Sequence, residues 1–200
     1  MAELLSSIGG RFACRAYRNT PVADAELDAV LEAGRIAPSA VGMEPWRFIV
    51  VRSDAARKKV AAACFGQPAA TTAPLMIAIV ALVDALAPGS AYVEARLAAE
   101  AGGNPPPQEL RDMWQSLYAQ NDPKAWAIAQ CNFAAAQMML QATALGLATC
   151  PMGGFDEAAL GKALALPRGE APALVLALGH CAEPQGERRR RGMAELLTRL

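Results

Sequence analysis

The 200-residue sequence has little of what several large protein classes require. Its net charge is zero, because 19 basic residues balance 19 acidic ones. A generic polyanion binder is therefore excluded, and we expect no nucleic-acid partner. The longest apolar run, residues 75–83, is less than half the length that spans a bilayer. The first ten residues, MAELLSSIGG, lack the basic flank and apolar core of a secretory signal. We therefore expect a cytoplasmic protein that binds no membrane.

Histidine and paired cysteine are also scarce. The single histidine, His180, follows residues 173–179, an apolar run typical of a buried strand, and is interpreted as a strand-end residue. Because a nucleophile needs a base and the only histidine is assigned to a strand end, hydrolytic triads and histidine-ligated metals are disfavoured. The five cysteines are odd in number and form no CxxC pair, which argues against a disulfide framework and against zinc. We expect reduced thiols, no metal, and chemistry that depends on a bound cofactor.

The residues that are abundant predict one folded domain over residues 1–200. Hydrophobic residues make up 54% of the chain, and alanine alone supplies 45 positions. Helical periodicity is present over residues 2–9, 24–34, 55–63, 90–101 and 123–146. The last of these is apolar on most sides, as in a central helix. Apolar runs predict strands over residues 47–52, 75–83 and 173–179. Few strands scattered among helices predict an α+β domain built around a small sheet.

Three separated segments carry distinctive patterns. The first is Arg11-Phe-Ala-Cys-Arg15-Ala-Tyr17, and the second is Ala37-Pro-Ser-Ala-Val-Gly-Met-Glu-Pro-Trp46. The third runs from Trp126-Ala-Ile-Ala-Gln130 to Cys150-Pro-Met-Gly-Gly-Phe-Asp156. In this order and spacing they resemble the FMN-dependent nitroreductase family, over almost the whole chain. The resemblance implies a nitroreductase-like fold, with the long central helix at the interface of a homodimer whose two sites are shared between the chains.

The resemblance also implies a phosphate site made from both ends of the chain. Arginine suits a phosphate dianion because its planar fork makes paired, charge-assisted hydrogen bonds. The run of arginines at 188–191 would by itself be typical of a solvated tail, but a K-x-R pair of the family aligns with two of its members. The implied residues at the FMN phosphate are Arg11, Phe12, Ala13, Arg15, Arg188 and Arg190.

Further residues are implied around the flavin ring. Backbone N–H groups of Gly153 and Gly154 would lie near N5 and O4, since glycine lets a backbone approach a flat ring. Taken alone, that loop would be a turn before a helix at 157–165 capped by Asp156. Trp114 and Tyr118 are predicted to contact substrate, with core packing as the alternative. The other implied ring contacts are Pro151, Met152, Gln67 and, from the second subunit, Pro38, Ser39 and Ala40.

The implied function is that of an FMN oxidoreductase. Hydride would pass from NAD(P)H through flavin N5 to a nitroaromatic, a quinone or a similar small acceptor in a ping-pong cycle, with no catalytic side chain. Position 153 is glycine where many relatives have glutamate, which widens the pocket. This departure leaves open a specialised relative that desaturates, dehalogenates or degrades flavin. A non-catalytic nucleotide binder that uses the arginine run is a third alternative, which the zero net charge disfavours.

Overall fold

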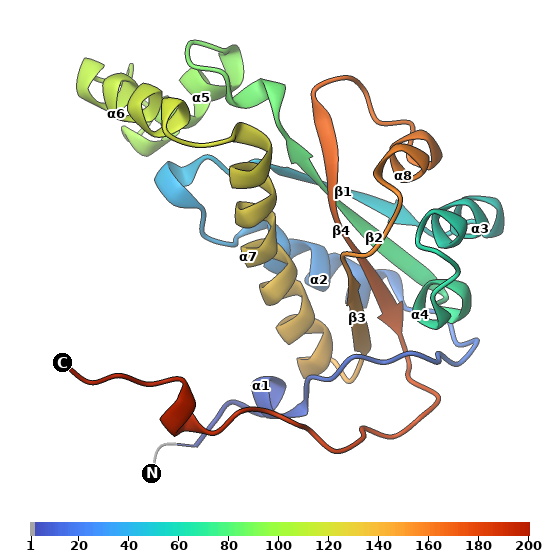
Figure 1. Cartoon of the computed structure of the whole chain (residues 1–200). Helices are drawn as coiled ribbons and strands as arrows, with labels where there is room; N and C mark the ends of the chain where they lie inside the picture. The colour runs from blue at the N-terminus through green and yellow to red at the C-terminus, as the bar shows by residue number, and fades with distance from the viewer. Residues whose placement is uncertain (1–2) are drawn as a thin grey trace.

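A computed structural model describes residues 3–200 and contains a four-stranded antiparallel sheet in the order β1-β2-β4-β3 (Figure 1). The strands are β1 (Trp46–Val51), β2 (Leu75–Leu82), β3 (Ala148–Met152) and β4 (Glu170–Gly179). Three of them confirm the predicted strands. The fourth, β3, is a correction, because residues 150–152 were expected in a loop and instead pair with β4. His180 directly follows β4, as predicted.

Helices cover both faces of this sheet. Side chains alternate along a strand, so Ile77 and Ile79 of β2 point to one face and Met76 to the other. The first face packs against α2 (Asp24–Arg35) and α7 (Pro123–Ala144). The second packs against α3 (Asp54–Ala63), α4 (Pro68–Thr72) and α8 (Glu157–Ala163), as Figure 1 shows. The sheet is thus the middle of three layers, which confirms the predicted α+β class.

The long helix α7 begins where the sequence predicted. The Asp122 carboxylate accepts a hydrogen bond from the Ala125 N–H at 2.6 Å, and Pro123 occupies the first turn. Small residues such as Ala127, Ala134 and Ala142 are fully buried along its length. Even so, no helix within residues 3–200 is long and apolar enough to cross a membrane. α8 likewise starts at the predicted cap, where Asp156 accepts from the Ala159 N–H at 2.9 Å.

Two helices extend beyond the end of the sheet. They are α5 (Ala91–Glu100), which confirms the predicted helix at 90–101, and α6 (Gln108–Ala119). The glycine and proline cluster at 102–107 separates them. Arg111 joins the pair, because its guanidinium bonds the Glu94 carboxylate at 2.7 Å. The sequence analysis predicted no helix at α6, although Leu110, Trp114, Leu117 and Tyr118 recur there at helical spacing. Short 3-10 turns complete the fold at Ala40–Gly42, Asp84–Leu86 and Met193–Glu195.

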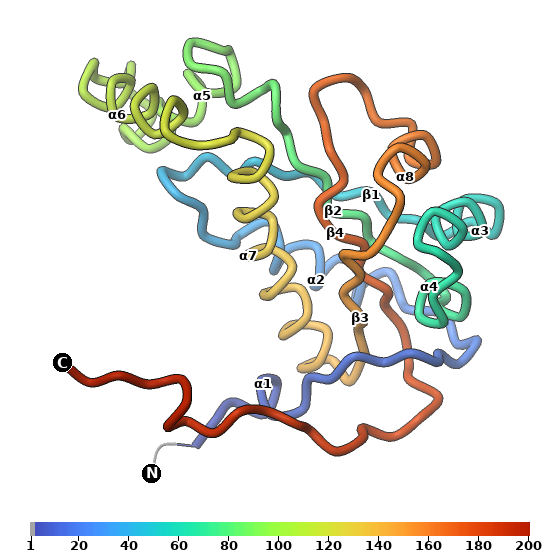
Figure 2. Tube along the Cα trace, viewed as in Figure 1, coloured from blue at the N-terminus to red at the C-terminus, as the bar shows by residue number. Residues whose placement is uncertain are grey.

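The two ends of the chain run together along the sheet's β3 edge (Figure 2). The predicted helix at 2–9 is shorter, since α1 spans Ser6–Gly10, and residue 2 lies outside the described residues. An irregular stretch at residues 11–17 follows α1. Its Ala13 pairs in parallel with Thr149 of β3, and Tyr17 pairs with Cys181 just beyond β4.

The expectation of unpaired cysteines is wrong. Cys14 and Cys181 form a disulfide with their Cα atoms 5.8 Å apart, although 167 positions separate them in sequence. The pairing follows from tertiary structure, because the Tyr17–Cys181 bridge brings the two segments side by side. No local spacing could indicate it. Cys64, Cys131 and Cys150 remain free and buried.

One glycine of the sheet has no room for a side chain. A Cβ on Gly179 would lie 2.7 Å from two ring carbons of Pro74, which cannot rotate away. We expect Gly179→Ala to lower the free energy of unfolding by about 1–3 kcal/mol, as overpacking does. The control is Gly161→Ala in α8, where nothing lies within 4 Å; it should raise stability by about 0.5–1 kcal/mol through helix propensity. Denaturant unfolding of both variants measures the difference, and equal stabilities would contradict the prediction.

Candidate functional site

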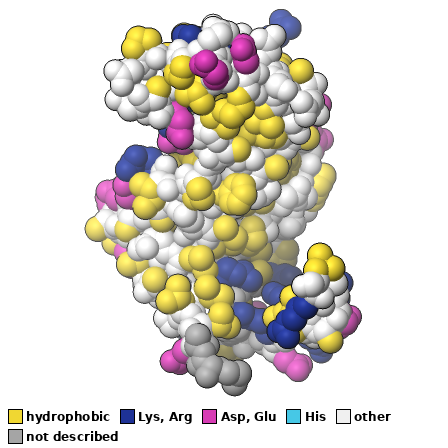
Figure 3. All heavy atoms as spheres, turned by 90° about the vertical axis from the view of Figure 1, so that its left-hand side faces the viewer, with side chains coloured by type: hydrophobic (Ala, Val, Ile, Leu, Met, Phe, Trp, Pro, Cys, Tyr) yellow, Lys and Arg dark blue, Asp and Glu magenta, His cyan; other side chains and the backbone are white. Residues whose placement is uncertain are grey.

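A cavity of about 380 Å³ lies where the two ends of the chain meet. Figure 3 shows Lys and Arg side chains gathered around a hollow in the lower part of the face that it presents. The cavity combines the first sequence motif with the arginine run, although these are almost 180 positions apart. Its lining residues are Arg11, Phe12, Ala13, Arg15, Gln185, Gly186, Glu187, Arg188, Arg189 and Arg190.

Pairing with β3 sets the direction of the N-terminal side chains. The Cys14 N–H donates to the Thr149 carbonyl at 3.0 Å, so residues 13 and 14 lie extended beside the strand. Because side chains alternate on extended backbone, Arg15 is exposed while Cys14 is buried. Burial raises the pKa of the Cys150 thiol on β3, and the positive charges of Arg15 and Arg11 oppose that rise. The two arginines therefore place positive potential at this edge of the sheet.

The C-terminal arginines have two different roles. Arg188 holds the segment in place, since its guanidinium donates to the carbonyls of Gly9 at 2.8 Å and Arg11 at 2.6 Å. The Arg190 side chain bonds only the neighbouring carbonyl of Arg189, at 2.7 Å. Its other donors have no partner among residues 3–200 and face an exposed site. Sequence reasoning missed Gln185, Gly186 and Glu187, for which position just before the arginine run was the only available signal.

A second group of predicted residues meets at the end of β3. The Gln67 side-chain amide donates to the Gly154 carbonyl at 2.7 Å, which joins the loop before α4 to the glycine loop. Pro151 and Met152 are the last residues of β3, and Gly153 and Gly154 follow on exposed backbone. Within residues 3–200, neither glycine N–H donates a hydrogen bond. A Cβ on Gly153 would meet nothing within 4 Å. The loop thus offers two backbone donors on an open surface.

The segment with Pro38, Ser39 and Ala40 lies elsewhere. In Figure 1 this light-blue loop is on the left, well apart from the chain ends near α1, and none of the residues that line the arginine cavity belongs to it. Pro38 and Ala40 are exposed, and the Ala40 N–H donates to the Oε1 of buried Gln130 at 2.9 Å. The Ser39 hydroxyl accepts from the Glu44 N–H at 2.8 Å. One chain therefore does not bring this segment to its own cavity.

The same loop has an unusual backbone. Val41, Gly42 and Glu44 have φ of 54°, 56° and 43°, in the left-handed region. For a β-branched residue such as valine this is a genuine outlier. Residues in sparsely populated conformations cost roughly 1–3 kcal/mol each and persist only where surrounding contacts fix them. The loop must therefore be held by strong contacts.

The two predicted substrate residues differ in exposure. Trp114 is 1% exposed, and its indole N–H donates to the Leu86 carbonyl at 3.1 Å. It stacks edge-on against Trp126, with ring centroids 5.3 Å apart. Tyr118 lies one turn further along α6 and is half-buried. Substrate contact stays a prediction for both, and Tyr118 has the more accessible side chain.

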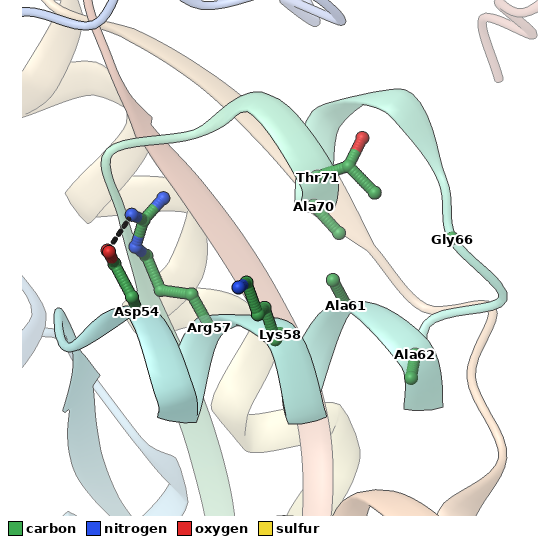
Figure 4. Close-up of a pocket in the computed structure, with 8 residues that line it drawn as sticks. All are labelled: Asp54, Arg57, Lys58, Ala61, Ala62, Gly66, Ala70 and Thr71. Carbon is green, nitrogen blue, oxygen red and sulfur yellow. Dashed lines mark hydrogen bonds and ion pairs between the residues drawn. The ribbon is translucent and has the colours of Figure 1, made fainter.

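A further cavity, of about 400 Å³, lies between α3 and α4 (Figure 4). Its basic residues are Arg57 and Lys58, and three alanines form much of the wall. The Arg57 guanidinium is already engaged, since it donates to the Asp54 carboxylate and to the Ala73 carbonyl. This cavity therefore offers less free positive charge than the arginine cavity.

Comparisons with known proteins agree with these observations. A model of the nitroreductase family matches residues 8–180. A protein of Thermus thermophilus named NADH dehydrogenase is 34% identical over 177 residues, which are 86% of this chain and 84% of that protein. A protein of Staphylococcus haemolyticus, named as an NAD(P)H nitroreductase, is 32% identical over 144 residues, 68% of this chain and 66% of its own length.

Solved structures share the fold. A nitroreductase of Exiguobacterium sibiricum in complex with FMN superposes with a TM-score of 0.81 at 24% identity, over 100% of this chain and 98% of that one. A Staphylococcus epidermidis protein described as an NAD(P)H:FMN oxidoreductase gives a TM-score of 0.79 at 22% identity, over 98% and 94% of the two chains. The α+β fold is thus of the nitroreductase type. The chain belongs to the nitroreductase family.

Proposed function

We propose that the protein is an NAD(P)H-dependent FMN oxidoreductase. The observation that carries the proposal is the arginine cavity, which gathers Arg11, Arg15 and Arg188–Arg190 in a chain of zero net charge. A phosphate dianion is the kind of group that such a cluster binds, through charge-assisted hydrogen bonds. Arg188 would contribute mainly by fixing the two segments, and Arg15 and Arg190 by contacting the phosphate.

The glycine loop fits the other end of the cofactor. The free N–H groups of Gly153 and Gly154 would hydrogen-bond the N5 and O4 edge, and the Gln67 amide would meet the pyrimidine edge. Bound FMN would supply the redox chemistry, taking hydride from NAD(P)H at N5 and passing it to an acceptor such as a nitroaromatic or a quinone. The chain's part is then to bind, orient and tune the flavin. No side-chain acid or base is required of it.

A homodimer completes this site. Large apolar side chains are exposed on α7 and near it, including Phe133 (51%), Leu145 (37%) and Ile36 (61%). Figure 3 shows hydrophobic side chains spread over this face. A second copy of the chain would cover them and would bring its own Pro38, Ser39 and Ala40 to the flavin. The terminal segments, where Met193, Leu196 and Leu197 are exposed, would add to the same interface.

A specialised flavoenzyme of the family is the second candidate, favoured by one observation. Gly153 stands in open space at a position where the family resemblance leads us to expect a glutamate, so the proposed flavin site is open on that side. The acceptor could then be larger than a simple nitroaromatic or quinone. Tyr118 is the residue that we propose for acceptor contact in either case, in a protein working in the cytoplasm.

Purification tests the proposal directly. We expect a yellow protein that releases FMN on denaturation, or a colourless one that takes up added FMN with a change in flavin fluorescence. Anaerobic addition of NADH or NADPH should bleach the flavin, and a quinone should restore its colour. A protein that binds no FMN would refute the proposal. Binding without bleaching by either nucleotide would favour the second candidate.

A further inference from the structure

Helix α5, which lies outside the three family motifs, contacts the strained loop at residues 38–44. α5 presents Tyr92, Arg96 and Glu100, spaced four apart and therefore on one helical face, toward this loop. α5 lies in the segment between β2 and α7 that carries none of the three motifs. All three side chains lie close to residues 42–44 of the loop.

Arg96 makes the central contacts. Its Nε donates to the Gly42 carbonyl at 2.7 Å, and its Nη2 bonds Oε1 of Glu44 at 2.6 Å. A planar guanidinium can satisfy both acceptors at once, whereas an ammonium group can only approach one of them in good geometry. The two acceptors belong to two of the residues that have positive φ. Arg96 therefore bonds the strained part of the loop itself.

Tyr92 adds a contact on the other side of Glu44. Its hydroxyl lies 2.9 Å from the Met43 carbonyl oxygen and 2.6 Å from the Glu44 carbonyl oxygen, and it can donate its proton to either. Burial raises the pKa of this phenol, which keeps that proton in place. Close packing completes the contact, since a Cβ on Gly42 would lie 2.8 Å from the Glu100 carboxylate.

We propose that Arg96 and Tyr92 are positioning residues that hold the loop of residues 38–44 in the conformation that meets the flavin of the partner subunit. This inference rests on the proposed function. The loop's exposed residues Pro38 and Ala40 would make that contact, while α5 fixes the backbone behind them.

The expected change in FMN affinity depends on how often the loop adopts the conformation that meets the flavin. The apparent Kd for a ligand rises in proportion as the binding-competent state becomes rarer. If the released loop keeps the correct conformation a tenth of the time, the Kd for FMN rises about tenfold. Because the loop would touch the flavin, the visible circular dichroism of the bound flavin should change as well. A purely structural residue would alter stability without altering that spectrum.

The test compares Arg96→Ala with a matched control. Arg111→Ala removes an arginine that likewise binds a carboxylate, that of Glu94, and a backbone carbonyl, that of Pro106, but makes no bond to the loop. FMN titration, flavin circular dichroism and thermal unfolding of the FMN-free protein are measured for both. We expect the Kd and the spectrum to change only for Arg96→Ala, while both variants lose some thermal stability.

Conservative variants keep the test valid if Arg96→Ala does not fold. Tyr92→Phe should raise the Kd less than Arg96→Ala, and Arg96→Lys should recover part of the affinity. Amide hydrogen exchange at residues 40–44 should be faster in all three than in Arg111→Ala. Unchanged FMN affinity and spectrum in these variants, with a wild type that binds FMN, would overturn the positioning role alone. A wild type that binds no FMN would overturn the proposed function and this inference with it.

Discussion

A variant carrying Arg15→Ala and Arg190→Ala is expected to lose FMN while keeping its fold. Both side chains are exposed and line the arginine cavity, and neither forms an ion pair among residues 3–200. A hydrogen bond to a charged group contributes about 1.5–3 kcal/mol, so losing two raises the Kd by at least about a hundredfold. Fluorescence titration of FMN with the purified variant measures this change.

The control for this variant is Arg18→Ala. Arg18 is also exposed and lies three positions beyond Arg15, but it does not line the cavity. Its removal should leave the Kd within about twofold, because a distant exposed charge is screened by salt. Arg188 is a poorer choice, since its loss would also free the C-terminal segment from Gly9 and Arg11. If the double variant binds FMN as Arg18→Ala does, the phosphate site lies elsewhere.

Opening the disulfide between Cys14 and Cys181 is expected to cost a large part of the protein's stability. The bond closes a loop with a sequence separation of 167. The chain-entropy account assigns about 5 kcal/mol to a loop of this size, and native disulfides typically contribute about 2–5 kcal/mol. We therefore expect Cys181→Ser to lower the free energy of unfolding by about 3–5 kcal/mol under non-reducing conditions. Guanidinium unfolding followed by circular dichroism measures it.

Reductant supplies the control for that measurement. Dithiothreitol should destabilise the wild type to the level of Cys181→Ser and leave the variant unchanged. Cys14→Ser combined with Cys181→Ser should be hardly less stable than either single variant, since the bond is lost once. Thiol titration of the unfolded, unreduced protein should find three thiols, those of Cys64, Cys131 and Cys150. Five thiols would contradict the assignment. In a reducing compartment the pair would be two thiols, so stability depends on the redox state of the surroundings.

Local patterns predicted the fold's central elements well. The strand predicted at 75–83 shows as an apolar run because it is buried on both faces. The start of α7 was predictable because the Asp122 cap acts within a few residues. β3 was not predicted, because Pro151 and the following glycines have the composition of a turn. Its pairing with β4 comes from tertiary structure. The disulfide was not predicted for the same reason.

The candidate site was likewise predicted only in part from the sequence. The joining of Arg11 and Arg15 with the arginine run was predicted from the family resemblance, and these residues line one cavity in the structure. Arg96 and Tyr92 were not predicted, since α5 carries no motif and three of their four acceptors are backbone carbonyls. Every residue has a main-chain carbonyl, so the sequence of side chains does not indicate which carbonyl accepts a hydrogen bond. Such contacts become visible only in three dimensions.

The disulfide also has a topological consequence. It makes residues 14–181 a covalent ring that contains the whole sheet and helices α2 to α8, with two short tails outside it. Most of the cavity's cations, Arg11 and Arg188–Arg190, lie on the tails, whereas Arg15 and the glycine loop lie in the ring. A protease that trims the exposed C-terminal tail would therefore leave the closed body intact and remove Arg188–Arg190 from the proposed phosphate site. The proposed contacts to the flavin ring thus lie in the closed body, whereas most of the proposed phosphate contacts lie on its tails.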